Sequence, residues 1–210
     1  MNDQHELYAS NVYWDKRAST FDDEPDHGLK DPIVRACWRQ LLAAQIPSEA
    51  AKVLDVGCGT GSLSILLAEL GHRVIGVDVS PEMISLAREK AVRYQLPIEF
   101  QVRNAAALDL SVRLFDLILC RHLLWAFSNP TDVLTSWGNH LKDGGRLILI
   151  EGFWDAGGGI HPDKIASLLP SIFKKQTMLD LSQQTHLWGK DVSDERYILV
   201  ADKIYNHIAY

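Results

Sequence analysis

Residues 53–62 read Val-Leu-Asp-Val-Gly-Cys-Gly-Thr-Gly-Ser. Strand-forming residues run into three glycines at alternate positions, and a periodic apolar segment follows at 63–70. This order predicts a buried parallel strand, a tight turn and a helix. Glycines adopt positive φ angles and let a ligand approach the backbone closely, and the first turn of the helix offers free N–H groups at its positive end. The stretch therefore predicts a nucleotide-binding turn in an α/β protein.

A second predicted strand, residues 73–78, ends in an acid. Asp78 stands 21 residues beyond Gly57, where a carboxylate can accept hydrogen bonds from both hydroxyls of an adenosine ribose. The glycine spacing then narrows the choice of ligand. A dinucleotide fingerprint has glycines at its first, third and sixth places, whereas here they stand at 57, 59 and 61, and the sixth place is Ser62.

An acid inside the first predicted strand adds to this pattern. Asp55 is costly in a buried strand unless it has a partner, so its presence indicates a binding role. A purely structural glycine turn and a dinucleotide site remain open as alternatives.

Composition and charge limit the class of protein. The 210 residues suffice for one α/β domain with a full core, and 47% hydrophobic with 23% charged residues is typical of a globular chain. The formal net charge is −6 and no long basic run occurs, which disfavours a nucleic-acid partner. No apolar stretch has the length of a membrane span, and residues 1–6 do not resemble a signal peptide. We therefore expect a cytoplasmic protein, monomeric or homodimeric, with a small-molecule partner.

The cysteines and histidines indicate neither disulfides nor a metal centre. Cys37, Cys58 and Cys120 are odd in number and far apart, which suggests a reducing compartment. No Cys/His spacing resembles a zinc site, and the eight histidines are scattered along the sequence. We therefore expect no bound metal.

Helix and strand signals alternate along the rest of the chain. Residues 5–20 show a loose helical pattern, 22–30 read as a polar loop, and Asp31 with Pro32 begins a helix that reaches about residue 45. The further predicted elements are helices at 80–91, 130–141 and 162–169, strands at 98–102, 115–120 and 146–150, a turn at 143–145, and extended segments at 173–181 and 195–201, with helix between these two only at 181–190. The alternation indicates a parallel sheet, and the last two segments suggest an antiparallel edge.

Together these motifs resemble the class I S-adenosylmethionine (SAM) methyltransferases, and within them the methyltransferase type 11 group that includes quinone-biosynthesis methylases. The resemblance covers about residues 10–155 and rests on residues 53–61, on Gly-Val-Asp-Val-Ser-Pro-Glu-Met at 76–83, on Phe-Asp-Leu-Ile at 115–118 and on Leu-Lys-Asp-Gly-Gly at 141–145. It implies a Rossmann-like sheet of seven mostly parallel strands, with an antiparallel last strand and helices on both faces. The single domain would comprise a helical lid at 1–48, a SAM-binding core at 50–155, and a helix with a strand pair at 156–210.

The same resemblance implies SAM as the cofactor and assigns its contacts. The glycine turn would line the methionine half, Asp55 would hold the ammonium group, and Asp78 would accept from the ribose. The full implied set is Tyr13, Trp14, Asp55, Gly57, Cys58, Gly59, Gly61, Asp78, Val79, Met83, Asn104, Ala105 and Arg121. Asn104 stands where the family often has Asp, so its hydrogen bond to the adenine amino group would lack a charge. For the aromatic segment 13–18, packing on the sheet is an alternative to a lid over the pocket.

Acceptor residues are expected just after the fourth and fifth strands, because ligands in open α/β sheets bind outside the carboxyl ends of the strands. His122 is the candidate general base, since imidazole titrates near neutral pH; a histidine that only bonds the backbone is the alternative. His27, Trp125 and Trp154 are the candidate substrate-binding residues, and the two tryptophans suit an apolar or aromatic acceptor.

Two functions are compatible with this set of cofactor residues. The sequence favours a SAM-dependent methyltransferase that moves a methyl group to a small molecule, and a SAM-binding regulatory or assembly module without transfer activity is the alternative. Asp55 and the glycine spacing argue against a dehydrogenase. The acceptor atom stays open, because acceptor residues lie on loops that vary independently of the fold.

Overall fold

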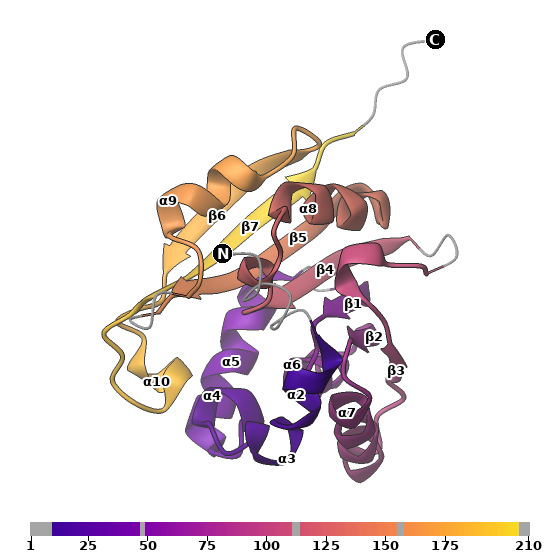
Figure 1. Ribbon diagram of the computed structural model, residues 1–210, viewed down its shortest axis with the longest axis vertical. Coiled ribbons are helices and arrows are strands. Elements are labelled where there is room, and N and C mark those ends of the chain that lie inside the picture. Colours follow the sequence, from indigo (N-terminus) through magenta and orange to yellow (C-terminus); the bar gives the residue numbers. More distant parts are fainter. Residues whose placement is uncertain (1–9, 47–48, 111–113, 155–157, 206–210) are drawn as a thin grey trace.

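One seven-stranded sheet organises the computed structural model, which describes residues 10–46, 49–110, 114–154 and 158–205. The strand order is β3-β2-β1-β4-β5-β7-β6 (Figure 1). The strands are β1 (Lys52–Val56), β2 (Arg73–Asp78), β3 (Glu99–Val102), β4 (Phe115–Arg121), β5 (Leu141–Phe153), β6 (Phe173–Asp180) and β7 (Glu195–Lys203). Neighbours from β3 to β5 run parallel, while β7 runs antiparallel to β5 and β6. The predicted fold, mostly parallel with an antiparallel last strand, is confirmed.

Helices cover both faces of this sheet. The helices are α2 (Asn11–Asp15), α3 (Ala18–Phe21), α4 (Pro25–Gly28), α5 (Pro32–Gln45), α6 (Ser62–Glu69), α7 (Pro81–Tyr94), α8 (Pro130–Asn139), α9 (Pro162–Ile165) and α10 (Thr185–Trp188), with short 3-10 turns η1 (Ala105–Ala107), η2 (Leu124–Ala126) and η3 (Ala166–Leu168). Figure 1 shows α8 and α9 on one side of the sheet, and α5, α6 and α7 on the other. None of the helices within the described residues is both long and apolar enough to cross a bilayer.

Local sequence explains where the long helices begin. Asp31 accepts hydrogen bonds from the N–H groups of Ile33 and Val34, and Pro32 follows it at the first helical position of α5. Ser80 accepts from the Met83 N–H in the same way at the start of α7, where Pro81 follows. Both N-caps are confirmed as the sequence predicts them.

Strand β1 is buried on both faces because its side chains alternate between two cores. Leu54 and Val56 belong to the core that includes Trp137 of α8. Val53 belongs to the opposite core, which includes Trp38 of α5. A near-continuous apolar run is typical of such a central parallel strand, and it leaves Asp55 as the strand's single acid.

Four predicted elements differ from the structure. Residues 22–30 are not wholly a loop, because α4 forms a helical turn there. The turn predicted at 143–145 lies inside β5, where Gly144 has a φ of +72° and the register with β4 shifts, so this strand starts at Leu141 rather than 146. The helix at 162–169 is split into α9 and η3, and the helix at 181–190 is only α10. Glycine supplies the positive φ that a β-bulge needs. The glycines that predict a turn at 143–145 therefore mark an irregularity within the strand instead.

Some predictions fall partly outside the described residues. Positions 5–9 of the loose helical pattern are among them. The division into 1–48, 50–155 and 156–210 stays a prediction.

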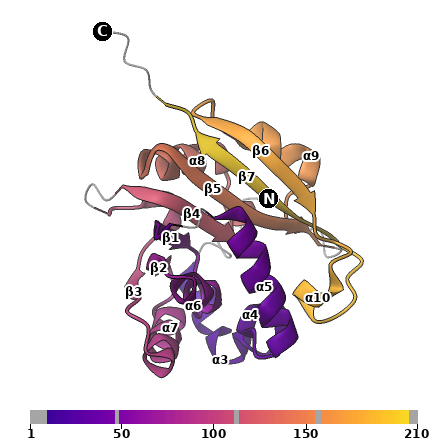
Figure 2. The same ribbon diagram turned by 180° about the vertical axis from the view of Figure 1, so that it is seen from behind.

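The C-terminal segment returns to the body of the molecule through α10. The indole N–H of Trp38 in α5 donates to the Leu187 carbonyl at 2.7 Å, and the rings of Trp38 and Trp188 meet edge to face with centroids 5.4 Å apart. Figure 2 shows α10 beside α5. The tail thereby brings Trp188 to the carboxyl end of β4, next to the site described below.

Candidate functional site

A cavity of about 260 Å³ opens at the carboxyl ends of β1, β2 and β4. Most of the predicted site residues line it: Trp14, His27, Asp55, Gly57, Cys58, Gly59, Asp78, Val79, Met83, Asn104, Ala105, Arg121, His122, Trp125 and Trp154. Phe21, Leu63, Leu123 and Phe127 complete the lining. The site therefore joins segments that are more than a hundred residues apart in the sequence.

The glycine turn forms the floor of the cavity. The N–H groups of Gly57 and Cys58 donate to the Val77 carbonyl at 2.8 and 3.0 Å, so the turn is fastened to β2. Gly57 and Gly59 have φ angles of +70° and +52°, which a residue with a Cβ rarely adopts. A Cβ at Gly59 would also lie 3.2 Å from the Phe21 ring. The turn thus leaves a shallow backbone cradle that side chains would fill.

Two acids flank this cradle. Asp55 is buried and accepts a hydrogen bond of 2.5 Å from the Ser64 hydroxyl of α6, and burial raises the pKa of Asp55 to about 6. Asp78 accepts from the Gly59 N–H through Oδ2 and from the Ser80 N–H through Oδ1, each at 2.9 Å, while burial raises its pKa. These carboxylates can accept from hydroxyl groups or hold a cationic group of a ligand.

An N-terminal segment covers the cradle. Trp14 and Phe21 line the cavity from this segment, and two aspartates fasten it to the core. Asp15 accepts from the Ser80 hydroxyl at 2.5 Å. Asp22 accepts from the Thr60 hydroxyl at 2.5 Å and pairs with the Lys90 ammonium at 2.8 Å. The segment is therefore anchored to the glycine turn at Thr60 and to the start of α7 at Ser80.

Two predicted cofactor residues lie outside the cavity lining. The Arg17 guanidinium stacks 3.7 Å from the centroid of the Tyr13 ring, and Tyr13 does not border the cavity. Gly61 begins α6 with a φ of +79°, and a Cβ there would approach Phe100 to 2.8 Å. The packing against β3 therefore requires glycine at 61 whether or not a ligand binds.

Asn104 and Arg121 line the cavity but also make contacts within the protein. The Asn104 side chain accepts from the Ala106 N–H at 2.9 Å and caps η1. The Arg121 guanidinium donates to the Asp26 backbone carbonyl at 2.5 Å and lies 5.1 Å from the Trp38 ring. Arg121 therefore ties α4 to the end of β4.

His122, directly after β4, forms part of the cavity wall opposite the glycine turn. This residue has a φ of +55°, unusual without glycine, and its N–H donates to the Ile150 carbonyl at 2.9 Å. Its ring packs edge to face on Trp154, with centroids 5.2 Å apart, and stacks towards Trp188 at 6.2 Å. Burial, followed by the charge of Arg121, holds the pKa of His122 well below its usual value. The imidazole is therefore neutral near pH 7 and can accept a proton or a hydrogen bond.

His27 faces the same wall from α4. Its ring stacks on Phe21 with centroids 4.4 Å apart. Burial and the charge of Arg121 lower the pKa of His27, more strongly than Asp26 raises it. Two neutral imidazoles therefore border the cavity.

Glu151 supports this wall from behind, although it does not line the cavity. Its side chain is 0% exposed, and Oε1 accepts from the N–H groups of Leu123 and Leu124 at 3.1 and 2.8 Å. Oε2 has no hydrogen-bond partner among the described residues, and burial raises the pKa of Glu151 to about 8. The carboxyl group fixes the backbone that follows His122.

Residues 53–145 match the family model described as a methyltransferase domain. This segment contains the glycine turn, both acids and His122. Residues 53–145 are therefore a methyltransferase domain of this family.

Curated relatives of this methyltransferase domain are quinone-biosynthesis enzymes. A ubiquinone biosynthesis O-methyltransferase from Cereibacter sphaeroides is 31% identical over 160 residues, which are 76% of this chain and 62% of the relative. One from Xanthomonas axonopodis pv. citri is 30% identical over 143 residues, which are 67% of this chain and 56% of the relative. The chain thus spans less than two thirds of the length of these relatives.

Solved structures share the fold at low sequence identity. The N-methyltransferase NodS from Bradyrhizobium japonicum WM9, in complex with S-adenosyl-L-homocysteine, has a TM-score of 0.70 and 20% identity, covering 92% of this chain and 99% of NodS. Magnesium protoporphyrin IX methyltransferase from Synechocystis PCC 6803, with bound SAM, has a TM-score of 0.62 and 24% identity, covering 81% and 77%. The cyclase SpnF has a TM-score of 0.70 and 21% identity, covering 80% of each chain. Such likeness shows the fold alone.

The cavity lining contains four residues that the sequence did not indicate. Leu63 opens the helix after the glycine turn, and Leu123 and Phe127 flank the predicted Trp125, so proximity to known motifs could have indicated these three. Phe21 carried no such signal, because nothing in the sequence shows that it folds back over Gly59.

Proposed function

We propose that the chain is a SAM-dependent methyltransferase that acts on a small-molecule acceptor. The observation that carries this proposal is the meeting of Asp55, the glycine cradle and Asp78 in one cavity of a methyltransferase-family domain. NodS and the magnesium protoporphyrin methyltransferase, which share the fold, hold S-adenosylhomocysteine or SAM, and this supports SAM as the cofactor.

The residues of the cavity fit SAM. Asp78 would accept from the ribose hydroxyls, since each carboxylate oxygen has two lone pairs and Oδ2 and Oδ1 accept from the N–H groups of Gly59 and Ser80. Asp55 would hold the ammonium group, and the open backbone at Gly57 and Gly59 would admit the methionine half. The remaining contacts would come from Trp14 over the methionine half and from Val79, Met83, Asn104 and Ala105 around the adenine.

We propose a hydroxyl-bearing, largely apolar acceptor. Trp125 and Trp154 pack against each other with centroids 5.5 Å apart, and Leu123 and Phe127 extend the apolar wall. Such walls bind flat apolar molecules, and a cavity of this volume holds a small molecule. The curated relatives are named as O-methyltransferases, which supports oxygen as the acceptor atom.

His122 would accept the hydroxyl proton. When bound, SAM supplies a methyl group on a positively charged sulfur. The acceptor oxygen would bond to this methyl group as the sulfur–carbon bond breaks, with S-adenosylhomocysteine as the second product. Nε2 of His122, buried and without a hydrogen-bond partner among the described residues, would take up the proton that the oxygen loses, and the aromatic wall would keep water away from the reacting atoms.

A transfer assay tests this function. SAM labelled in its methyl group is incubated with phenol, catechol, amine, thiol and carboxylate acceptors, and we expect labelled product from the aromatic hydroxyl compounds. Binding of SAM without transfer to any acceptor would favour the regulatory or assembly module. Labelled amine with no labelled phenol would contradict oxygen as the acceptor atom.

We further propose a cytoplasmic location and a site complete within one copy of the chain. Free thiols at Cys37, Cys58 and Cys120 support a reducing compartment. The net charge of −6 supports the absence of a nucleic-acid partner. One chain supplies all the lining residues given above, so a monomer or a homodimer would serve equally.

A further inference from the structure

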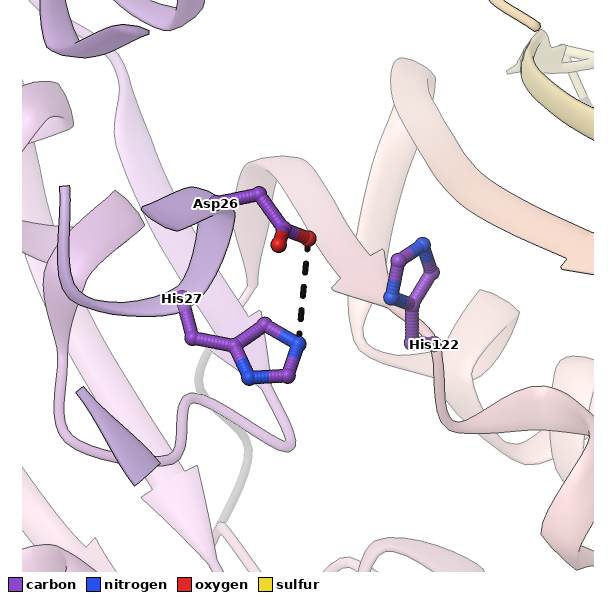
Figure 3. A group of neighbouring side chains, drawn as sticks. All are labelled: Asp26, His27 and His122. Carbon is purple, nitrogen blue, oxygen red and sulfur yellow. Dashed lines mark ion pairs between the residues drawn. The ribbon is translucent and has the colours of Figure 1, made fainter. Parts of the chain in front are cut away.

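Three side chains with metal-binding atoms converge at the wall of the cavity. Asp26 and His27 come from α4, and His122 follows β4; one donor atom of each lies within 4.8 Å of the others. Figure 3 shows Asp26 and His27 facing His122, with the contact between Asp26 and His27 marked by a dashed line. We propose that Asp26, His27 and His122 form a binding site for one transition-metal dication.

The spacing of the donor atoms fits a shared ion better than direct hydrogen bonds. His27 Nε2 lies 3.7 Å from Asp26 Oδ2, whereas a hydrogen bond needs about 3.2 Å or less. Ligands of one zinc ion each lie about 2.1 Å from it, so their donor atoms stand about 3–4 Å apart. A separation of at most 4.8 Å therefore requires only a small side-chain movement to close around an ion.

The backbone holds the three ligands in place. The Arg121 guanidinium donates to the Asp26 carbonyl, and the His122 N–H donates to the Ile150 carbonyl. His122 Nε2 is buried and has no hydrogen-bond partner among the described residues. The α4 segment and the residue after β4 are thus fixed opposite each other. Nε2 of His122 stays free to bind a metal ion.

Two guanidinium groups, those of Arg121 and Arg196, stand close to this site. Arg196 approaches Asp26 Oδ2 to 3.8 Å, but it makes a two-point ion pair with Asp194 at 2.7 and 3.1 Å and lies 4.3 Å from the Trp188 ring. Neither arginine makes a hydrogen bond to the Asp26 carboxylate among the described contacts. The Asp26 carboxylate, on a residue that is 3% exposed, contacts Arg196 only through this 3.8 Å ion pair, which a bound ion would replace.

The donor set selects the kind of ion. Two imidazoles with one carboxylate suit Zn²⁺, Co²⁺ and Fe²⁺, whereas Mg²⁺ and Ca²⁺ prefer oxygen ligands throughout. His27 and His122 both line the cavity, so open coordination positions would face it. If the proposed function holds, an acceptor hydroxyl would release its proton to solvent as it binds to the ion, and the ion rather than His122 would activate it.

Cobalt titration tests the site without SAM, acceptor or activity. The full chain is stripped of metal with a chelator, and Co²⁺ is added while its visible absorption is followed. We expect one equivalent to bind with the absorption of a nitrogen-ligated ion, to be displaced by Zn²⁺, and not to be displaced by Mg²⁺. No saturable absorption change with the wild-type chain would overturn the proposal.

Matched variants locate the bound ion. His27→Ala and His122→Ala should each lose the saturable signal, whereas His186→Ala, an exposed histidine on α10, should retain it. Circular dichroism and S-adenosylhomocysteine titration of the same samples report folding and the cofactor site. Cobalt bound equally by the folded double variant His27→Ala/His122→Ala would place the ion elsewhere and contradict this site. The transfer assay can fail while cobalt binds, so the two proposals are separately testable.

Discussion

The two ends of the cavity are held in different ways. At the cofactor end, backbone groups of neighbouring strands hold the glycine turn, through the hydrogen bonds of Gly57 and Cys58 to Val77. At the acceptor end, side chains from α4, β5 and α10 surround His122. The buried Glu151 carboxyl group accepts hydrogen bonds from the backbone that follows His122.

The two ends should therefore respond differently to substitutions. A turn held by its backbone depends on φ angles, so a substitution there should abolish binding with little loss of fold. A wall held by side chains depends on their packing, so substitutions there should change stability and acceptor binding together. Variants at the two ends therefore test whether the division is real.

Gly59→Val should have the largest effect. Its φ of +52° and the 3.2 Å approach of a Cβ to Phe21 place the new methyl groups in the space for the cofactor, and we expect SAM binding to fall below detection. The strained angle should cost about 1–2 kcal/mol of unfolding free energy, which leaves the chain folded. Calorimetry and thermal melting measure the two effects.

Gly71→Val is the matched control for this strain. Gly71 has a φ of +91° and no atom within 4 Å of a Cβ, and it does not line the cavity. It should lose similar stability yet bind SAM as the wild type does. Retained SAM affinity in folded Gly59→Val would reduce the glycine run to a structural turn.

Asp78→Ala should weaken SAM binding by about 1.5–3 kcal/mol, the range for hydrogen bonds to a charged group, or roughly 10- to 150-fold. Asp78→Asn keeps an oxygen that can accept from the N–H of Ser80 or Gly59. This variant therefore separates the effect of the lost charge from the effect of the lost backbone hydrogen bonds. Titration with SAM measures both. Wild-type affinity in Asp78→Ala would remove this residue from the ribose site.

Glu151→Ala should act on the acceptor end instead. It leaves the N–H groups of Leu123 and Leu124 without their acceptor, and a buried donor in that state costs about 1–3 kcal/mol. We expect a lower melting temperature and a raised KM for the acceptor, with SAM affinity unchanged. Glu151→Gln retains an acceptor oxygen, so its melting temperature and its KM for the acceptor should both lie close to the wild-type values. An equal loss of SAM affinity would mean that the two ends are not independent.

The same residue predicts a pH dependence. Burial raises the pKa of Glu151 from 4.5 to about 8 in the folded chain, so the folded state holds this proton more tightly than the unfolded state. Its contribution to stability is therefore fully present below pH 4.5 and is lost as pH rises to about 8. Chemical unfolding across this range should show a smaller decline for Glu151→Gln than for the wild type. Equal slopes would contradict the raised pKa.

The sequence predicted the cofactor end better than the acceptor end. Asp55, Gly57 and Asp78 lie on one strand-turn-helix-strand segment, where local spacing determines geometry, and all three border the cavity. Trp188 and Phe21 reach the site only through tertiary packing. Asp26 and His122 are close in space but 96 residues apart in the chain, so no spacing motif could indicate their convergence.

Two neighbouring aromatic residues give the smallest expected effects and sharpen the role of the N-terminal segment. Trp14 lines the cavity and Tyr13 does not. Trp14→Ala should weaken SAM binding by about 1 kcal/mol through lost apolar contact, whereas Tyr13→Ala should change it by less than about 0.5 kcal/mol. The reverse order, measured by calorimetry, would mean that the segment sits differently over the bound cofactor.

Calorimetric titration of the full chain with S-adenosylhomocysteine and with NAD tests whether the cradle built by Asp55, the glycine turn and Asp78 binds SAM rather than a dinucleotide. We predict saturable binding of one S-adenosylhomocysteine per chain and no binding of NAD. Binding of NAD without S-adenosylhomocysteine would contradict the account.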